Sequence, residues 1–389
     1  MFNEQHLHFF EQIKTPFYYY DLDLLKKTIT AIRTESERYN YHVHYALKAN
    51  TDKKILQELM LAGFGADCVS GNEVKCALNN GFANNKVVFA GVGKSDDEIN
   101  FALSNDIFCF NCESIQELEV VNALAGNLNT KARIALRINP NVNANTHKYI
   151  TTGLEENKFG INPYEFDTIL EKLKHCPNLQ LIGLHFHIGS QITDLTPFKN
   201  LCTRVNEIQA WFNQKGHHLE NINVGGGLGV NYKEPDTELI PDFAAYFKIF
   251  NDFLELRPGQ QVHFELGRAI VAQCGNLISK VLYIKNGINT NFAILDAGMT
   301  ELIRPALYQA YHKIENLSKK NNITKVARYD VVGPICESSD CFGKAVYLPE
   351  THRGDVFVIR TAGAYGEVMT SQYNLRKKNK AVYSDELKW

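Results

Sequence analysis

The sequence predicts an α/β protein made of a (β/α)8 barrel of the TIM type and a second, C-terminal all-β domain. Between residues 43 and 265, short β-forming runs alternate with amphipathic stretches, in the number and spacing expected of such a barrel. After Glu265, alternating β-branched and aromatic residues, interrupted by turn signals, replace that rhythm. A doubly wound open sheet is the alternative for the first part, but that fold usually needs fewer strands.

The barrel is expected over residues 21–265. Its eight strands are predicted at Val43–Leu47, Ala66–Val69, Val87–Ala90, Ile107–Phe110, Arg133–Ile138, Leu181–His187, Asn221–Val224 and Val262–Glu265. Helical periodicity separates these runs, and a further helix is expected around residues 22–39, before the first barrel strand. The aromatic run at residues 15–20 predicts an isolated strand that stands apart from the barrel.

The β domain is expected over residues 266–389. Its strands are predicted at Leu277–Ile284, Phe292–Leu295, Val326–Val332, Ala345–Leu348 and Asp355–Arg360, with Asn286-Gly287 as a hairpin turn. A helix at residues 308–316 is the one helical segment expected there. No linker rich in glycine, proline or serine separates the two domains, so we expect them to pack closely.

The amino-acid composition limits the kinds of binding partner and the cellular compartment that we expect for this protein. The 389 residues are 44% apolar and carry a net charge of -2 with acids and bases interspersed, which argues against nucleic acid and membrane partners. The start of the chain lacks an apolar signal region, so we expect a cytoplasmic protein. The nine cysteines fit a reducing compartment, and the Cys109/Cys112 pair is interpreted as ordinary packing because no second pair follows at zinc spacing.

Lys48 is the first candidate for chemistry. It ends an apolar β-forming run and precedes a helical pattern, so it is placed in a βα loop at the carboxyl end of the first barrel strand. An amine that is partly desolvated there can act as a nucleophile toward a carbonyl. A lysine that merely extends to solvent is the alternative reading of this stretch by itself.

Other unusual residues fall at the same ends of the strands, where barrels of this kind collect their functional groups. They are Asp67, Ser70, Arg137, His185, His187, Gly225, Gly226, Gly227, Glu265, Gly267 and Arg268. The triple glycine fails the dinucleotide spacing because its last glycine comes one residue early. We interpret it as a phosphate cradle aided by Gly267 and Arg268, with a plain tight turn as the alternative.

Glu265 and His187 have structural alternatives as well. Glu265 is expected either to pair with a protonated ring nitrogen or to form a salt bridge within the barrel. His187 is suited to stacking on a flat ring, and a metal site with His185 is the weaker alternative because no further ligands occur at metal spacing. A lysine, a phosphate cradle, an acid and a stacking imidazole together describe a pyridoxal 5'-phosphate site, so no metal is expected.

The chain resembles the alanine-racemase-fold (fold type III) pyridoxal phosphate-dependent decarboxylases over nearly its whole length. The motifs that carry the resemblance occur in a fixed order at residues 45–50, 185–191, 225–227, 265–268, 336–340 and 364–366. Residues 152–160 and 304–308 are similar to the branch that acts on diaminopimelate rather than on ornithine or arginine. Leu266 stands where this family usually has proline, and Ser339 where glycine is common, and we expect both to change backbone stiffness more than chemistry.

The resemblance implies a role for each matched residue. Lys48 would hold the cofactor, His187 would stack on its ring, and Glu265 would pair with the pyridine nitrogen. Residues expected around the cofactor, most of them at its phosphate end, are Ser190, Gly225, Gly226, Gly227, Gly267, Arg268 and Tyr365, and Asp67, Glu73 and Arg137 match supporting positions. Residues expected to bind the substrate are Arg268, Arg304, Tyr308, Glu337 and Tyr365.

The resemblance further implies a homodimer with active sites at its interface, in which Cys336 of the second subunit donates a proton and Glu337 accompanies it. It also places the N-terminal strand, within residues 1–20, in the β domain. The expected reaction is decarboxylation of meso-2,6-diaminopimelate to L-lysine and carbon dioxide. Alternatives are an ornithine, lysine or arginine decarboxylase of the same fold, a racemase, and a non-catalytic carrier of the cofactor.

Overall fold

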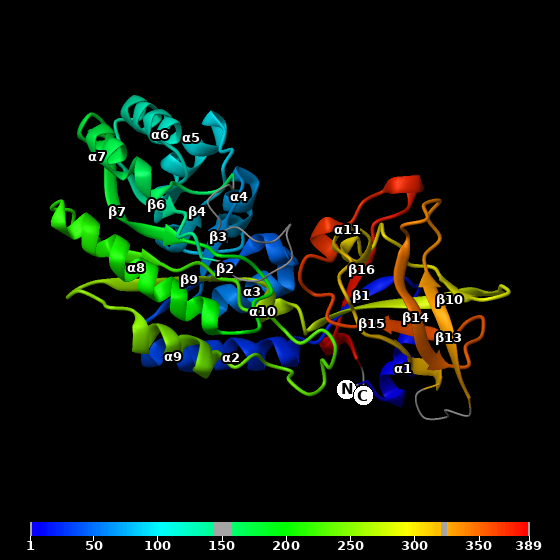
Figure 1. Ribbon diagram of the computed structural model, residues 1–389. Coiled ribbons are helices and arrows are strands. Elements are labelled where there is room, and N and C mark those ends of the chain that lie inside the picture. The colour runs from blue at the N-terminus through cyan, green and yellow to red at the C-terminus, as the bar shows by residue number, and fades with distance from the viewer. Residues whose placement is uncertain (1, 143–157, 320–324, 388–389) are drawn as a thin grey trace. The chain divides into compact units, whose positions relative to one another are not determined.

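The computed structural model describes residues 2–142, 158–319 and 325–387, and Figure 1 traces them along the chain. The described chain forms two compact units. The barrel unit contains residues 29–229 and 242–267, and the β unit contains residues 1–28, 230–241 and 268–389. The sequence places 230–241 in the barrel, but in the structure this segment clusters with the β unit.

The barrel unit contains the predicted closed barrel, so the fold class is confirmed. Its strands run in sequence order as β2 (His42–Ala46), β3 (Gly65–Cys68), β4 (Val87–Phe89), β5 (Cys109–Cys112), β6 (Ala132–Ile138), β7 (Leu179–Phe186), β8 (Asn221–Asn223) and β9 (Gln261–Leu266). Every neighbouring pair is parallel, and β9 closes the ring by pairing with β2, with Leu266 opposite Tyr45. All carboxyl ends therefore meet at one end of the barrel.

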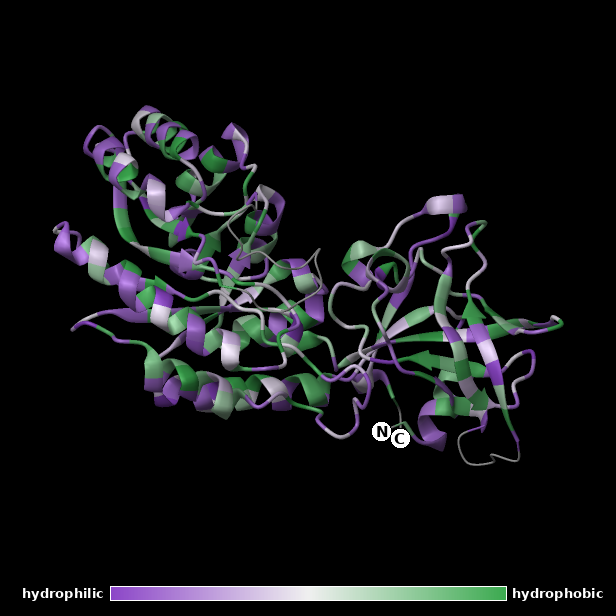
Figure 2. Cartoon of the chain, viewed as in Figure 1, coloured by the Kyte–Doolittle hydropathy of each residue, from purple (hydrophilic) through white to green (hydrophobic). Residues whose placement is uncertain are grey.

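Helices surround these strands (Figure 1). They are α2 (Leu22–Arg38), α3 (Lys53–Leu61), α4 (Gly71–Asn79), α5 (Asp96–Ser104), α6 (Ile115–Asn127), α7 (Phe166–Lys174), α8 (Thr196–Gln214) and α9 (Phe243–Phe253). Helices α3 to α6 begin directly after their N-caps Asp52, Ser70, Ser95 and Ser114, whose side chains accept hydrogen bonds from the first turn. Figure 2 shows hydrophobic residues concentrated in the strands and polar residues along the outer helix surfaces.

The β unit holds an eight-stranded, mostly antiparallel sheet in the order β12-β15-β10-β11-β13-β14, with β1 joining β10 to β16. Its strands are β1 (Phe17–Tyr20), β10 (Gly275–Asn286), β11 (Asn291–Leu295), β12 (Ile314–Asn316), β13 (Val326–Val332), β14 (Cys341–Pro349), β15 (Val356–Ile359) and β16 (Lys380–Tyr383). The aromatic strand β1 pairs with β10 from Phe17 to Tyr20. Helices α1 (Glu4–Glu11), α10 (Arg268–Val271) and α11 (Arg304–Tyr308) complete the unit.

Buried apolar side chains explain why the N-terminal segment belongs to the β unit. Phe10, Phe17 and Tyr19 pack in one core cluster with Val356 and Val358 of β15. The helix expected at 308–316 is wrong: α11 ends at Tyr308, and residues 314–316 form β12 against β15. Tertiary pairing with β15 overrides the local pattern in that segment.

Candidate active site

Lys48 lies just beyond the carboxyl end of β2, in a short 3-10 turn over Leu47–Ala49. Its ammonium lies 3.4 Å from a carboxylate oxygen of Asp67 on β3, and its side chain is 38% exposed. Lys94, in another βα loop, differs because its ammonium donates to two backbone carbonyls and to Glu117 while only 1% of its side chain is exposed. Lys48 is thus less enclosed than Lys94, and its side chain remains accessible to a ligand.

Two acids near Lys48 are protonated more easily than usual. Burial raises the pKa of Asp67 to about 6, with Glu265 adding to the shift and Lys48 opposing it. Burial likewise raises the pKa of Glu73 to about 7, although the backbone amide of Val69 donates to Glu73 at 2.7 Å and opposes the shift. Near neutral pH this edge of the site therefore exchanges protons.

Glu265 on β9 is the centre of a buried network, which we call the carboxylate centre and define as Glu265, Asn111, Asn223 and His185. One carboxylate oxygen accepts the side-chain amides of Asn111 at 3.1 Å and Asn223 at 2.7 Å, and the other accepts His185 at 2.9 Å. Burial acts to raise the pKa of Glu265, but His185 and Lys48 outweigh it and lower the pKa below its usual range. Glu265 is therefore an ionised group with a fixed orientation.

His187 follows β7 and keeps a neutral ring. Burial lowers its pKa well below the usual range, and the charges of Lys48 and Arg137 lower it further. The backbone amide of Gly226 donates to its Nδ1 atom at 3.4 Å, which leaves the ring in a defined tautomer and orientation. A neutral, oriented imidazole suits stacking on a flat aromatic ring.

Close backbone packing requires glycine in the loop after β8. A Cβ atom on Gly226 would lie 1.9 Å from the carbonyl oxygen of Glu265, and Gly225 has φ +70° with equally little space. The amide of Gly225 donates to Asn223, and that of Gly226 donates to His187. The loop thus orders the stacking imidazole and the carboxylate centre as well as offering a turn without side chains.

Two other barrel residues of the prediction lie at the same end. Arg137, near the end of β6, pairs with Glu113 at 2.9 Å, and its guanidinium lies 4.6 Å from the centre of the Phe159 ring. Ser190 lies in the loop after β7, four residues past its last strand residue. The barrel unit thus assembles Lys48, Asp67, Arg137, His187, Ser190, Gly225, Gly226, Gly227, Glu265 and Gly267 around its carboxyl ends.

The β unit contains a second polar network, the guanidinium centre, defined as Arg268, Arg304, Tyr232 and His312. The Tyr232 hydroxyl accepts hydrogen bonds from Arg268 at 2.6 Å and Arg304 at 3.0 Å. Burial acts to raise the pKa of Tyr232, but the two guanidinium groups outweigh it and lower the pKa. Two buried cations therefore share one acceptor.

His312 and Tyr365 complete this centre. Arg304 donates to the Nε2 atom of His312 at 2.9 Å, while Nδ1 of His312 donates to the carbonyl of Arg360. Burial and the charge of Arg304 lower the pKa of His312 to about 3, so its ring is neutral and acts as an acceptor. The guanidinium of Arg268 also lies 4.8 Å from the centre of the Tyr365 ring. Tyr308 ends α11, which begins at Arg304.

The loop at residues 335–340, the Cys336 loop, presents Cys336 and Glu337 at the surface of this chain. Cys336 is the one exposed cysteine of the nine, all of which lie in the described part of the chain. Buried Asp340 anchors the loop, because its carboxylate accepts the amides of Ile335 at 2.7 Å and Met299 at 2.6 Å. Tyr373 donates to Glu337 at 2.8 Å.

Comparison with known proteins places this geometry in a family. Residues 22–272 match the family described as pyridoxal-dependent decarboxylase, pyridoxal binding domain. A diaminopimelate decarboxylase of Bacteroides thetaiotaomicron is 56% identical over 379 residues, covering 97% of both chains. A diaminopimelate decarboxylase of Helicobacter pylori is 43% identical, covering 97% of this chain and 92% of its own.

This chain belongs to the diaminopimelate decarboxylase family. The crystal structure of diaminopimelate decarboxylase from Helicobacter pylori complexed with L-lysine superposes with a TM-score of 0.91 and 40% identity, covering 98% of this chain and 94% of the other. An arginine decarboxylase of Paramecium bursaria Chlorella virus has the same fold, with a TM-score of 0.86 at 21% identity. The resemblance stated from the sequence is therefore confirmed.

Pyridoxal 5'-phosphate is the cofactor of this family, and the barrel residues fit it. Asp67 and His185 each keep one buried polar atom without a hydrogen-bond partner among the described residues, at the end of the barrel where Lys48 lies. The ionised Glu265 suits a protonated ring nitrogen, and neutral His187 suits the ring face. The family motif at 152–160 lies mostly in residues 143–157, outside the described part of the chain.

The sequence analysis did not predict several residues of the carboxylate centre and the guanidinium centre. Asn111, Asn223, Tyr232 and His312 are buried polar residues whose roles depend on partners far away in the chain. The sequence offers a signal for the two asparagines, since Asn223 lies near the end of a predicted strand, two residues before the triple glycine, and Asn111 directly follows another predicted strand. Asp340 lies in the family motif at residues 336–340, and the structure shows that it anchors the Cys336 loop.

Proposed function

We propose that this chain decarboxylates meso-2,6-diaminopimelate to L-lysine and carbon dioxide, the last step of lysine biosynthesis, in the cytoplasm. The observation that carries the proposal is the 56% identity to a diaminopimelate decarboxylase over 97% of both chains. The guanidinium centre supports it, because diaminopimelate has a distal carboxylate that ornithine and lysine lack. A buried pair of guanidinium groups is a natural partner for such a carboxylate.

In this proposal the barrel residues hold and tune the cofactor. Lys48 attaches it covalently, His187 packs on its ring, and Glu265 keeps its ring nitrogen protonated. When bound, pyridoxal phosphate accepts the electrons released as the carboxylate leaves. Asn111, Asn223 and His185 hold Glu265 ionised and oriented, so its charge is available without rearrangement.

The substrate is bound by Arg268, Arg304, Tyr308, Glu337 and Tyr365 in this proposal. Arg304 pairs with the distal carboxylate and Glu337 with the distal ammonium. An amino acid without the distal carboxylate would leave the buried guanidinium of Arg304 without its anionic partner, which disfavours ornithine. The charge pattern of the two ends thus determines which amino acid is accepted.

The proton that replaces the departing carboxylate is assigned to Cys336. We propose a homodimer in which Cys336 and Glu337 of one subunit serve the active site of the other. Their exposure in the single chain supports this, because an interface would cover both residues. Asp340 fixes the loop through two backbone amides, so Cys336 is presented with little conformational freedom.

The test measures carbon dioxide and L-lysine released by the holoenzyme from meso-diaminopimelate, with ornithine, lysine and arginine assayed in parallel. Release from diaminopimelate at a kcat/KM at least ~100-fold above the others supports the proposal, since a buried charged group left unpaired costs about 3 kcal/mol. Faster release from ornithine, lysine or arginine would identify the chain as a different decarboxylase of this fold. Accumulation of a diaminopimelate stereoisomer without carbon dioxide would indicate a racemase.

A further inference from the structure

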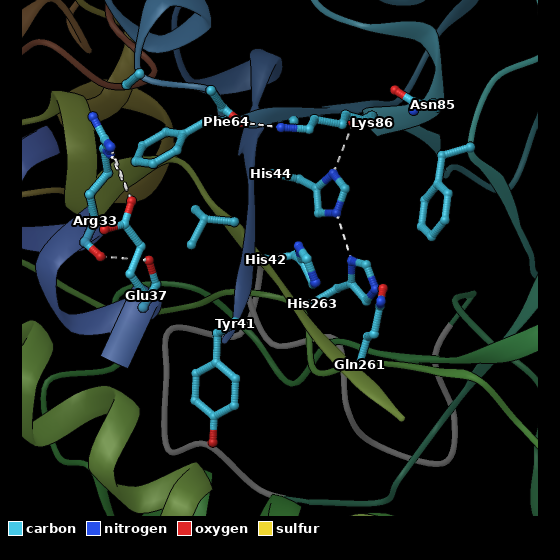
Figure 3. A pocket seen from close by; sticks show the side chains of 16 residues that line it. Arg33, Glu37, Tyr41, His42, His44, Phe64, Asn85, Lys86, Gln261 and His263 are labelled. Carbon is cyan, nitrogen blue, oxygen red and sulfur yellow. Dashed lines mark hydrogen bonds and ion pairs between the residues drawn. The ribbon is translucent and has the colours of Figure 1, made fainter. Parts of the chain in front are cut away.

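A pocket lies at the amino-terminal end of the barrel, opposite the end that carries Lys48. Figure 3 shows it, and we call it the basal pocket. It has a volume of about 250 Å³ and opens among the first residues of β2, β3 and β9 and the segment before β4. The charged and histidine residues that line it are Arg33, Glu37, His42, His44, Lys86 and His263. None of these residues takes part in the proposed decarboxylation.

Two buried histidines in this pocket form a chain of hydrogen bonds that ends on an acceptor at each side. The carbonyl oxygen of Lys86 lies 3.0 Å from Nδ1 of His44, and Nε2 of His44 lies 2.9 Å from Nδ1 of His263. Nε2 of His263 lies 2.9 Å from the side-chain oxygen of Asn221. The amide nitrogen of Asn221 donates to the carbonyl of Ile182 at 3.3 Å, and its amide oxygen faces His263.

This chain of hydrogen bonds needs three ring protons, one more than two neutral imidazoles carry. Lys86 and Asn221 both present oxygens, so the outer nitrogens of His44 and His263 must both carry protons. The contact between the rings needs a third proton. Two neutral imidazoles supply only two, so one of the three contacts would then join two acceptors. The geometry is complete only when the pair carries one positive charge.

The surroundings oppose that charge as long as the pocket holds no anion. Burial lowers the pKa of His44 to about 4, opposed chiefly by Glu265. Burial, followed by the charges of His44 and His42, lowers the pKa of His263 well below its usual range. The hydrogen bonds therefore require a third proton on the His44–His263 pair, whereas burial in the pocket disfavours that proton.

Most of the charged groups that face the pair are already paired with one another or held in the carboxylate centre. On α2, Arg33 pairs with Glu37 at 3.0 Å. Behind Phe108, whose ring centre lies 5.2 Å from that of His263, Arg133 pairs with Asp106 at 2.6 Å. The remaining charges are Glu265, held in the carboxylate centre, and the ammonium of Lys86. Within the pocket itself, Lys86 is thus the cation without a carboxylate partner among the described residues.

The pocket also offers donors to a ligand. Lys86 donates one proton to the carbonyl of Gly63 at 2.9 Å, and an ammonium has two more. The Nε2 atom of His42 is buried without a hydrogen-bond partner among the described residues, and its ring stacks on His263 at 4.9 Å. Figure 3 shows the three histidines side by side in the middle of the pocket. A small anion between Lys86 and His42 would offset the charge that the histidine pair requires.

We propose that the basal pocket binds a small oxyanion together with one proton, which the His44–His263 pair takes up. The oxyanion is a carboxylate or inorganic phosphate small enough for the pocket, and its charge balances the third proton of the pair. A metal ion does not suit this arrangement, because the nitrogens of His44 and His263 face each other. The described residues contain no group of three histidine, cysteine, aspartate or glutamate side chains placed to hold one.

The test is calorimetric titration of the holoenzyme with acetate and, separately, with phosphate. Titrations between pH 6 and 8 in buffers of different ionisation enthalpy measure the protons taken up. We expect about one proton per anion and affinity that falls roughly tenfold for each pH unit, since one proton is bound with the ligand. Whichever probe binds identifies the oxyanion class. Failure of both probes to bind, or binding without proton uptake, would overturn the proposal.

Variants separate this pocket from the active site. His44→Gln should abolish proton uptake and make any remaining affinity independent of pH, whereas the exposed His175→Gln should change neither. Unchanged proton uptake in His44→Gln, or loss of anion binding in Arg304→Met, would assign the anion to another site and contradict the proposal. These results do not depend on decarboxylation, so they stand apart from the test of the proposed function.

A spectroscopic measurement on the unaltered protein covers the case in which His44→Gln does not fold. Nitrogen-15 NMR of the histidine side chains distinguishes protonated from unprotonated ring nitrogens. With saturating anion, three of the four ring nitrogens of His44 and His263 should be protonated. Two protonated nitrogens under the same conditions would refute proton uptake by the pair.

Discussion

In the barrel unit one buried carboxylate is surrounded by hydrogen-bond donors, whereas in the β unit two buried guanidinium groups share one hydroxyl. Glu265 accepts three side-chain hydrogen bonds, and its pKa is lowered despite burial. Tyr232 accepts from Arg268 and Arg304, and its pKa is lowered for the same electrostatic reason with the signs reversed. Each unit thus stabilises one sign of charge and suits a ligand group of the opposite sign.

The two networks suit different ligand groups, because their buried charges have opposite signs. The carboxylate centre is fully bonded and suits a cationic ring nitrogen that needs one fixed negative charge. In the guanidinium centre two buried cations share the phenol of Tyr232, and Arg304 also donates to the neutral imidazole of His312. A network that brings two cations together suits an anionic substrate group.

Lys48→Ala should abolish the visible absorbance of the covalently bound cofactor and reduce carbon dioxide release by roughly 10³-fold or more, because the nucleophilic amine is removed. Absorbance spectra and a carbon dioxide assay measure both effects. Lys53→Ala, an exposed lysine on α3, is the matched control and should behave as the unaltered protein. Unchanged absorbance in Lys48→Ala would contradict its assignment.

Glu265→Gln should lower kcat by roughly 10²-fold while cofactor binding is retained, because the charge that keeps the ring nitrogen protonated is lost. The glutamine amide would also face one of the donors that now meet the carboxylate, so His185 or an asparagine must turn. Steady-state kinetics and cofactor absorbance measure these effects. A kcat within twofold of the unaltered enzyme would show that the carboxylate centre is only structural.

Arg304→Met should raise KM for diaminopimelate by roughly 100-fold, about 3 kcal/mol, because the distal carboxylate loses a charged partner. The affinity for the cofactor should change little, since most of its proposed ligands lie in the barrel unit and Arg304 is not among them. Titration of the apo form with pyridoxal phosphate, beside steady-state kinetics, separates the two. Equal losses of substrate and cofactor affinity would argue against a substrate role for Arg304.

Tyr232→Phe should raise KM roughly tenfold with a smaller change in kcat, because Arg268 and Arg304 lose their shared acceptor and repel each other. This variant keeps the aromatic ring, so packing is preserved. Kinetics with diaminopimelate give the KM-against-kcat split. Should kcat fall with KM unchanged, Tyr232 would act on the reaction itself and not on the orientation of the two guanidinium groups.

Glu73→Gln should alter the pH dependence of stability more than activity. The folded-state pKa of Glu73 is raised to about 7, so its ionisation destabilises the fold as pH rises from about 4.5 to 7. Below that window the two proteins should be equally stable, and above it the variant should be more stable by up to about 3 kcal/mol. Chemical unfolding at pH 4, 5.5 and 7.5 measures the difference. A difference that is constant across these pH values would contradict the raised pKa.

The barrel could be predicted from the sequence alone, because its eight alternating strand and helix segments are local patterns. The gathering of Lys48, Glu265 and the triple glycine at one end could be predicted as well, since parallel strands bring their carboxyl ends together. The aromatic run at residues 15–20 was recognised as a strand, but its place beside β10 and β16 depends on pairing across hundreds of residues.

The hydrogen-bond partners of the buried charges could be identified only from the tertiary structure. Asn111 and Asn223 meet at Glu265, and Tyr232 meets Arg268 and Arg304, although no local pattern links these positions. The His44–His263 pair likewise joins the first and last barrel strands. Hydrogen bonds between side chains form wherever folding brings a donor to an acceptor, so the sequence fixes which groups exist while the closed barrel and the sheet fix which of them meet.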